Sequence, residues 1–402
     1  MIKEFWKYVK ENKKFLLLSF MMMSSVVVPI PCGQEMFYLT MLYIFVFSVQ
    51  NKGLSSGKEM PFVLMLVFIL LSSFVNMIFD IRLFLFIFII LGVSPIFSSY
   101  TNFKFKERLL RMLFFLIPVI SVVNIYCHRA GINYFQSEFV SELDFSGIMS
   151  HPMWLGALAG ISNVALFYLI MKNKEKSWLI KGGLIFLLLC SLYVSVIAGS
   201  RSALAVSLVS MAFVLYLFSD GLGTIMKVAV IVGVIASLTL PTFMEGATRM
   251  KMKMENQDAD LMEGGSRSHL WSMRVKEIEE SPLFGVGFAT AYVWGHKVTG
   301  RIESGSGWLS VISQTGILTF VAVMMIMWNC VPGLKLVKRD KRLALFYGEL
   351  CYFTIHSFAE GYLYTSGYYP CLLFWMLVSY LNELPVYFER SLAEKTQSLP
   401  SA

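Results

Sequence analysis

Apolar runs of about 15 to 20 residues recur along the whole chain, and they restrict its fold more than any other feature. A run of this length crosses a bilayer as a helix, because a helix satisfies its own backbone hydrogen bonds. The composition agrees, since 56% of the residues are hydrophobic and only 15% are charged. We predict an all-α polytopic membrane protein with about twelve transmembrane helices, at 15–31, 36–50, 62–79, 83–99, 112–126, 152–171, 182–199, 203–218, 225–243, 308–331, 343–360 and 370–384.

The distribution of lysine and arginine predicts how these helices are oriented. With the N-terminus in the cytoplasm, the predicted cytoplasmic segments hold 23 of the 34 basic residues, as the positive-inside rule requires. Of the other eleven, eight lie in one long loop, 244–307, and long loops are exempt from the rule. Both chain ends are therefore predicted to be cytoplasmic. The net charge of +8 reflects this orientation and indicates no nucleic-acid partner.

We interpret residues 1–402 as a single membrane domain in which the loop 244–307 is folded and caps the outer face. Within the loop, 267–280 is expected to form a helix, because an apolar stripe recurs at helical spacing and the dipeptide SP at 281–282 ends it. The segment PLFGVGF, which follows, turns the chain back towards the bilayer.

The tetrapeptide GSRS occurs at 199–202 and again at 265–268, and each copy lies where a helix is expected to begin. Glycine permits close backbone approach, serine caps the helix, and the helix N-terminus favours an anion. Arginine adds a planar donor fork that suits phosphate or diphosphate. Either Gly-Ser merely opens the helices and Arg201 snorkels to the interface, or these segments hold a diphosphate through Arg201, Arg267, Arg274, Ser202 and Ser268.

Further polar residues are expected on the same outer side, where they would line a cleft. Each could instead be an ordinary interfacial residue, and His151 could simply start a helix before a proline. In a cleft, a carboxylate or histidine could act as general base on a sugar hydroxyl, with an arginine-held diphosphate as leaving group. We find no metal-ligand or redox spacing and expect neither a metal nor a cofactor. The candidates are His151, His296, Arg301, Glu303, His356 and Glu360.

Four strings in fixed order resemble the O-antigen ligase and polymerase superfamily. The strings lie between about residues 151 and 320, and a weaker similarity occurs at Glu360. They read HPMWLGALAG, GSRSALAVSL, GGSRSHLWSMRVKEIEESPLFGVGF and SGWLSVISQTGIL. The superfamily contains Wzy-type polymerases of O-antigen, capsule and exopolysaccharide, and the ligases that join O-antigen to lipid A core.

The resemblance implies a metal-independent membrane glycosyltransferase of the GT-C type that acts on undecaprenyl-diphosphate-linked sugars. It implies that Arg201 and Arg267 contact the lipid diphosphate. In the ligases and many polymerases, a histidine begins the segment that reads ESGSGWL here. This chain has no histidine at that point, and Glu303 stands there, so Glu303 becomes the leading candidate for the base, with His296 second and Glu360 a weaker one.

We therefore expect a Wzy-type polysaccharide polymerase in the bacterial inner membrane, with donor and acceptor both linked to undecaprenyl diphosphate. The resemblance also implies a chain-length-regulating membrane protein as partner. An O-antigen ligase is one alternative, and a lipid-linked oligosaccharide flippase or transporter is another. A transporter should carry charged groups at mid-span, and Glu349 is the only clear charge inside a predicted span. A structural scaffold or receptor would not need arginines at two helix starts.

Overall fold

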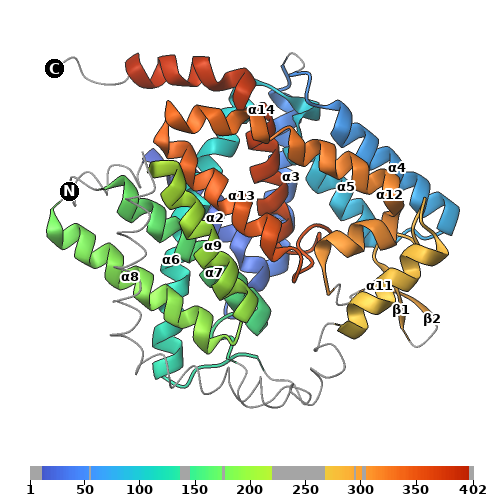
Figure 1. Cartoon of the computed structure of the whole chain (residues 1–402), viewed down its shortest axis with the longest axis horizontal. Coiled ribbons are helices and arrows are strands. Elements are labelled where there is room, and N and C mark those ends of the chain that lie inside the picture. Colours follow the sequence, from blue (N-terminus) through green and yellow to red (C-terminus); the bar gives the residue numbers. More distant parts are fainter. Residues whose placement is uncertain are drawn as a thin grey trace. The chain divides into compact units, whose positions relative to one another are not determined.

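The computed structural model describes residues 11–53, 56–135, 145–173, 177–219, 268–293, 296–300 and 305–397. Its elements are helices, apart from one two-stranded hairpin in the described ranges (Figure 1). The chain divides into two compact units. Unit 1 contains Met1–Met36, Arg111–His269 and Val337–Ala359, and unit 2 contains Phe37–Leu110, Leu270–Leu336 and Glu360–Ala402.

Unit 1 is built around one buried helix, α7 (Pro152–Lys172), which contacts three other helices of the unit. Most of its side chains are buried, because alanine, glycine and serine let neighbouring helices approach on all sides. The elements of unit 1 are α2 (Lys13–Met23), the 3₁₀ helices η1 (Ser24–Val26) and η4 (Lys341–Leu343), the C-terminal part of α6 (Tyr100–Arg129), α7, α8 (Trp178–Ile197), α9 (Arg201–Phe218) and α13 (Ala344–His356).

Unit 2 pairs α12 with α4, and α14 with α5. Two antiparallel strands, β1 and β2, form a hairpin in which Thr290 pairs with Thr299. The elements of unit 2 are α3 (Gly33–Gln50), α4 (Met60–Asn76), α5 (Ile81–Val93), η2 (Pro95–Phe97), the first part of α6, α11 (Ser268–Glu280), β1 (Thr290–Val293), β2 (His296–Thr299), α12 (Gly307–Trp328), η3 (Val331–Lys338) and α14 (Tyr369–Gln397).

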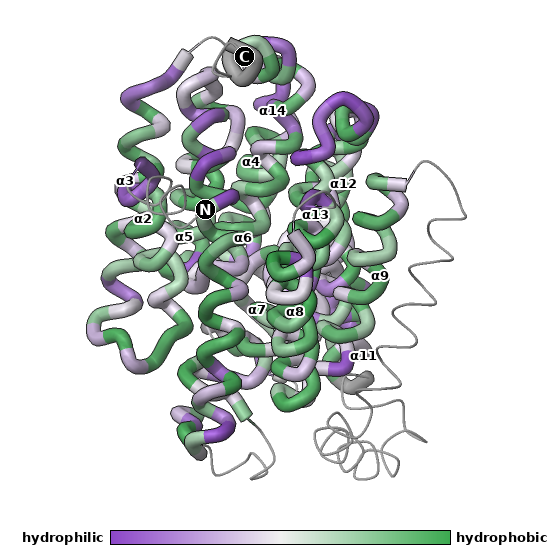
Figure 2. Tube along the Cα trace, turned by 90° about the vertical axis from the view of Figure 1, so that its left-hand side faces the viewer, coloured by the Kyte–Doolittle hydropathy of each residue, from purple (hydrophilic) through white to green (hydrophobic). Residues whose placement is uncertain are grey.

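The prediction of an all-α membrane protein is confirmed. In the described part of the chain, six helices are long and apolar enough to cross a membrane, and α4 and α5 are shorter apolar helices. Hydrophobic residues dominate along these helices (Figure 2). Eleven of the twelve predicted spans overlap a helix, and the ninth, 225–243, lies outside the described residues.

Two predicted boundaries are wrong: α6 begins earlier than expected, and the first span ends its α-helix earlier than expected. The segment 101–111 was predicted to be a cytoplasmic loop but is helical. Its Lys106 is buried and forms an ion pair with Glu383 of α14, and its ammonium group also donates to Ser379 Oγ at 2.9 Å. A charge with such partners can be buried in a helix instead of remaining in a solvated loop. The first predicted span, 15–31, leaves α-helical geometry after Met23.

Candidate functional site

The first GSRS copy forms a tight turn that opens α9. Gly199 has a positive φ of 64°, and Ser200 precedes the helix without a side-chain capping bond. Arg201 is the first residue of α9 and its side chain is exposed. The first N–H groups of a helix have no intrahelical partner and carry the positive end of its dipole. An exposed arginine at this position makes the turn suitable for an anion.

A glycine on α7 lets this turn approach closely. A Cβ added at Gly156 would overlap the Ser200 side chain, so only glycine fits without movement. One turn further along α7, a Cβ at Gly160 would overlap the ring and hydroxyl of Tyr352 from α13. The strings HPMWLGALAG and GSRSALAVSL are therefore in contact in unit 1, and the glycines of the first make room for the second.

Two of the predicted site residues are brought together here. Ser202 Oγ lies 3.1 Å from Nε2 of His356, and His356 Nδ1 lies 3.1 Å from the hydroxyl of Tyr352. That hydroxyl donates to the carbonyl oxygen of Ala157 on α7 at 3.3 Å. His356 and Tyr352 are fully buried, whereas Ser202 is half-buried. His356 therefore does not line a solvent-facing cleft in this structure but lies behind Ser202.

Buried polar side chains fix the three helices behind the turn. Asn163 of α7 donates from Nδ2 to Ser195 Oγ of α8 at 3.2 Å and to Ser207 Oγ of α9 at 3.1 Å. Such bonds satisfy polar groups that would otherwise be costly in an apolar span. The start of α9 is thus held on a rigid support.

His151 occupies the position before α7 and caps it. Its Nδ1 accepts a hydrogen bond from the backbone N–H of Met153 at 3.1 Å. Its exposed ring also contacts Phe135, with ring centroids 4.8 Å apart. The helix-start role weighed for His151 is therefore present, and a role in a cleft stays a prediction.

In unit 2, α11 extends over Ser268–Glu280 and ends before the SP dipeptide, which confirms the predicted helix. Its Arg274 is only 1% exposed. The guanidinium Nη1 donates to Glu277 Oε2 at 2.8 Å and to the carbonyl oxygen of Thr290 at 3.0 Å. Glu277 is also buried and accepts from the backbone N–H of Tyr292 at 2.7 Å. In this structure Arg274 belongs to an internal ion pair that joins α11 to the hairpin, and its predicted contact with a diphosphate stays a prediction.

The segment PLFGVGF packs against a break in α12. Gly316 has a positive φ of 82°, which interrupts the helix and exposes backbone groups. The N–H groups of Val286 and Gly287 donate to the carbonyl oxygens of Ser313 and Gln314, and the N–H of Ile317 donates to the carbonyl oxygen of Pro282. Irregular backbone at membrane depth is tolerated only where protein satisfies it. The third and fourth strings are therefore also in contact, at this break.

Two further candidates, His296 and Glu360, also lie in unit 2. His296 begins β2 and is exposed. Glu360 is 5% exposed, and its carbonyl oxygen accepts from the N–H of Gly307 at the start of α12. Lys297, next to His296, donates to Asn76 Oδ1 at 3.0 Å, and partial burial lowers its pKa. Trp271 of α11 donates to the carbonyl oxygen of Gly305 at 3.0 Å, next to ESGSGWL.

Several predicted residues cannot be placed. Arg267, Arg301 and Glu303 lie outside the described residues, and only the backbone of Ser268 is described. Among the residues that are described, no group of three or more histidine, cysteine or acidic side chains could hold a metal.

Comparison with known protein families finds a match over part of the chain. The model of a family described as O-antigen ligase matches residues 184–324, a segment that includes the GSRS turn, α11 and the break in α12. The match supports the chain's place in the O-antigen ligase and polymerase superfamily, and hence in glycosyl transfer of the ligase or polymerase type. A search of curated proteins finds no match.

The segment that matches the family model contains Arg201, Ser202, Arg274 and His296, whereas His151, His356 and Glu360 lie outside it. Tyr352 was not among the predicted site residues, although it lies four residues before His356 on the same helix face. That spacing was a usable signal. No sequence pattern indicated the bond from His356 to Ser202, 154 residues away.

Proposed function

We propose that this protein is a polysaccharide polymerase. It transfers a growing undecaprenyl-diphosphate-linked glycan onto a new lipid-linked repeat unit, at the outer face of the bacterial inner membrane. The observation that carries the proposal is the exposed Arg201 at the first position of α9, within the segment that matches the O-antigen ligase family model.

The start of α9 suits a lipid diphosphate for physical reasons. An arginine in an apolar helix is costly unless it binds an anion or reaches the interface. In the proposal, Arg201 and Arg267 hold the diphosphate with the hydroxyls of Ser202 and Ser268. They stabilise the charge that develops as the diphosphate leaves. Arg274 pairs with Glu277 of the same helix and thereby holds α11 in place beside the proposed site.

The choice of polymerase over ligase comes from the sequence ESGSGWL, which lacks the histidine that ligases place there. Glu303 is the proposed base that takes the proton of the acceptor hydroxyl. His296 is the second candidate, and Arg301 and Glu360 complete the proposed cleft. Such a transfer needs no metal, because the arginines supply the positive charge.

The proposed setting follows from orientation and chemistry. Both chain ends are cytoplasmic, and the loop 244–307 caps the site on the other side. The substrates reach it from the bilayer as lipids, and a chain-length-regulating membrane protein is the expected partner.

The test is the surface polysaccharide profile of a strain that lacks this protein, complemented with wild type, Arg201→Ala or Arg267→Ala. Wild type should restore a ladder of long chains, while both variants, present at normal level, leave core carrying a single repeat. A null strain that makes full-length polymer still attached to its carrier lipid would identify a ligase. Repeat units that accumulate on the cytoplasmic side would identify a flippase. Normal polymerisation by both variants would disprove the diphosphate site.

A further inference from the structure

The bonds from Tyr352 through His356 to Ser202 form a chain that we call the α13 relay. It begins at the buried carbonyl of Ala157 and ends at a half-buried hydroxyl beside the exposed Arg201. His356 is fully buried, and both of its ring nitrogens lie within hydrogen-bond distance of a hydroxyl. Because each ring nitrogen either donates or accepts, the tautomer of His356 sets the direction of both hydrogen bonds.

The Tyr352 hydroxyl has one proton and two neighbouring acceptors, the carbonyl oxygen of Ala157 at 3.3 Å and Nδ1 of His356 at 3.1 Å; in one arrangement it donates to Ala157. The contact with Nδ1 of His356 then requires Nδ1 to be the donor. In the neutral ring Nε2 therefore accepts, and the donor to it is the Ser202 hydroxyl. In this state the hydroxyl proton of Ser202 points inwards, and its oxygen offers only lone pairs to an incoming anion.

An anion at the start of α9 requires the opposite arrangement. Ser202 must donate outwards, so Nε2 of His356 must donate to Ser202 Oγ. The Tyr352 hydroxyl can then rotate and donate to Nδ1 of His356, which lies 3.1 Å from it, instead of to the carbonyl oxygen of Ala157, which lies 3.3 Å from it. The two states hold the same number of protons, so the change is one of tautomer and needs no net proton uptake.

We propose that the α13 relay makes Ser202 the hydroxyl that donates to a diphosphate oxygen, with His356 and Tyr352 as positioning residues that change direction when the anion binds. This deepens the proposed function and rests on it. Gly160 is part of the device, because any side chain there would displace Tyr352.

The first experiment is a binding titration of the full-length protein in nanodiscs with undecaprenyl diphosphate. Ser202→Ala should weaken binding about tenfold, the usual effect of losing one hydrogen bond to a charged group. His356→Leu should weaken binding by the same factor. The double variant should bind no more weakly than either single variant, because the two residues act as one unit. Tyr352→Phe, which keeps the ring, should lose about threefold, and Ser202→Thr should restore wild-type binding.

Matched controls separate this effect from damage to the fold. Ser210, on the same helix, bonds to its own backbone at Val206, so Ser210→Ala should bind like wild type. Undecaprenyl monophosphate and inorganic diphosphate show whether the lipid or the free anion is recognised; tight binding of inorganic diphosphate alone would identify a site for the free anion.

The decisive measurement is ¹⁵N NMR of labelled imidazole. The chain has five histidines, so the His356 signals are assigned by difference with His356→Leu, or with Tyr352→Phe if the first variant folds poorly. Adding undecaprenyl diphosphate should convert the Nδ1-protonated pattern to the Nε2-protonated one. Bound lipid with an unchanged tautomer, or fully additive effects of Ser202→Ala and His356→Leu, would overturn the relay while leaving the polymerase intact. A wild type that binds no lipid diphosphate would instead overturn the proposed function.

Discussion

Two arginines, each close to a GSRS copy, have opposite environments. Arg201 opens α9 with an exposed side chain, whereas Arg274 is 1% exposed and paired with Glu277. The helices themselves explain the difference. Helix α9 contains no acidic residue, while α11 places Glu277 one turn after Arg274. A nearby acid on the same helix lets an arginine be buried as part of the scaffold; without one, the arginine remains at the surface, where it can meet a ligand.

The largest expected effect on stability follows from replacing Arg274, the buried arginine of α11. Arg274→Met leaves Glu277 buried without its partner, and removing one member of a buried pair costs about 3–5 kcal/mol of unfolding free energy. The measurement is thermal unfolding of the purified protein in detergent. Replacing both residues, as Arg274→Met with Glu277→Leu, should recover much of the loss.

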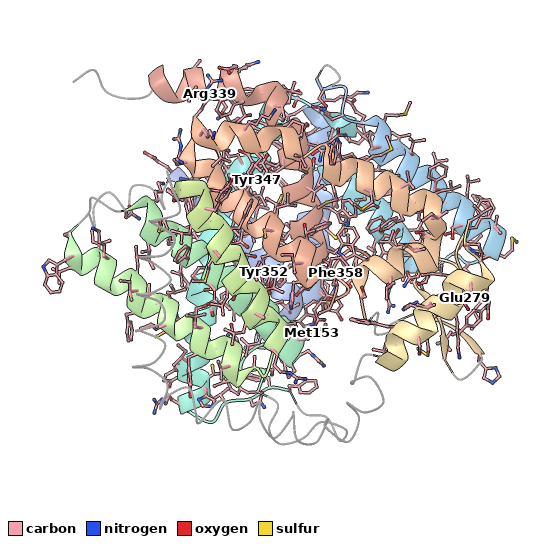
Figure 3. All side chains as sticks on the ribbon, viewed as in Figure 1. Met153, Glu279, Arg339, Tyr347, Tyr352 and Phe358 are labelled. Atoms are coloured by element: carbon pink, nitrogen blue, oxygen red, sulfur yellow. The ribbon has the colours of Figure 1, made fainter. Side chains whose placement is uncertain are left out.

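The control for this pair is Glu279→Ala, which removes an exposed acid from the same helix (Figure 3). It should change the free energy of unfolding by about 0.5 kcal/mol or less. If Arg274→Met is no less stable than Glu279→Ala, the assignment of Arg274 to the scaffold is wrong.

A smaller effect is expected at the glycine that supports the other arginine. Gly156→Ala forces the Ser200 turn away from α7, and overpacking of this kind costs about 1–3 kcal/mol. Because the turn carries Arg201, long polysaccharide chains should also be lost. Gly183→Ala on α8 is the matched control, since a Cβ there meets no atom within 4 Å. It should stabilise the helix slightly, as alanine replaces glycine. If Gly156→Ala and Gly183→Ala have the same stability and the same polysaccharide profile, the close approach of Gly156 to Ser200 is not important for either.

Glu349 of α13 extends the comparison to a buried charge without a partner. It is fully buried, and neither of its carboxylate oxygens has a hydrogen-bond partner in the described structure. In such surroundings an ionised carboxylate loses its solvation, which costs free energy that an uncharged side chain of the same shape avoids. Glu349→Gln should therefore change the free energy of unfolding by less than about 1 kcal/mol and leave polymerisation intact.

The matched variant is Glu383→Gln, which leaves Lys106 buried without its charged partner. It should be clearly less stable than Glu349→Gln. Loss of function without loss of stability in Glu349→Gln would be unexpected for a polymerase. It would instead favour the transporter alternative, in which a mid-span acid carries a proton.

Local patterns predicted most helices and the limits of α11, because apolar periodicity and the SP dipeptide act within one element. They did not predict contacts between distant elements. Lys106 looked like a loop lysine because its partner, Glu383, is 277 residues away. The break at Gly316 looked like ordinary helix because it depends on backbone donors from PLFGVGF. The four strings that resemble the superfamily indicated which segments are functionally related. They did not indicate that the first string contacts the second in unit 1 and that the third contacts the fourth in unit 2.

The smallest expected change in stability is at Arg201, and it comes with the largest expected change in function. The side chain is exposed at a helix start, so Arg201→Ala should alter the free energy of unfolding by about 0.5 kcal/mol or less. The surface polysaccharide ladder should nevertheless disappear, because a charge-assisted bond to the leaving diphosphate is lost. Lys13→Ala removes another exposed cation at a helix start, that of α2, and should leave both the stability and the ladder unchanged. A destabilised Arg201→Ala protein would mean that Arg201, like Arg274, belongs to the scaffold, and the contrast between the two arginines would then fail.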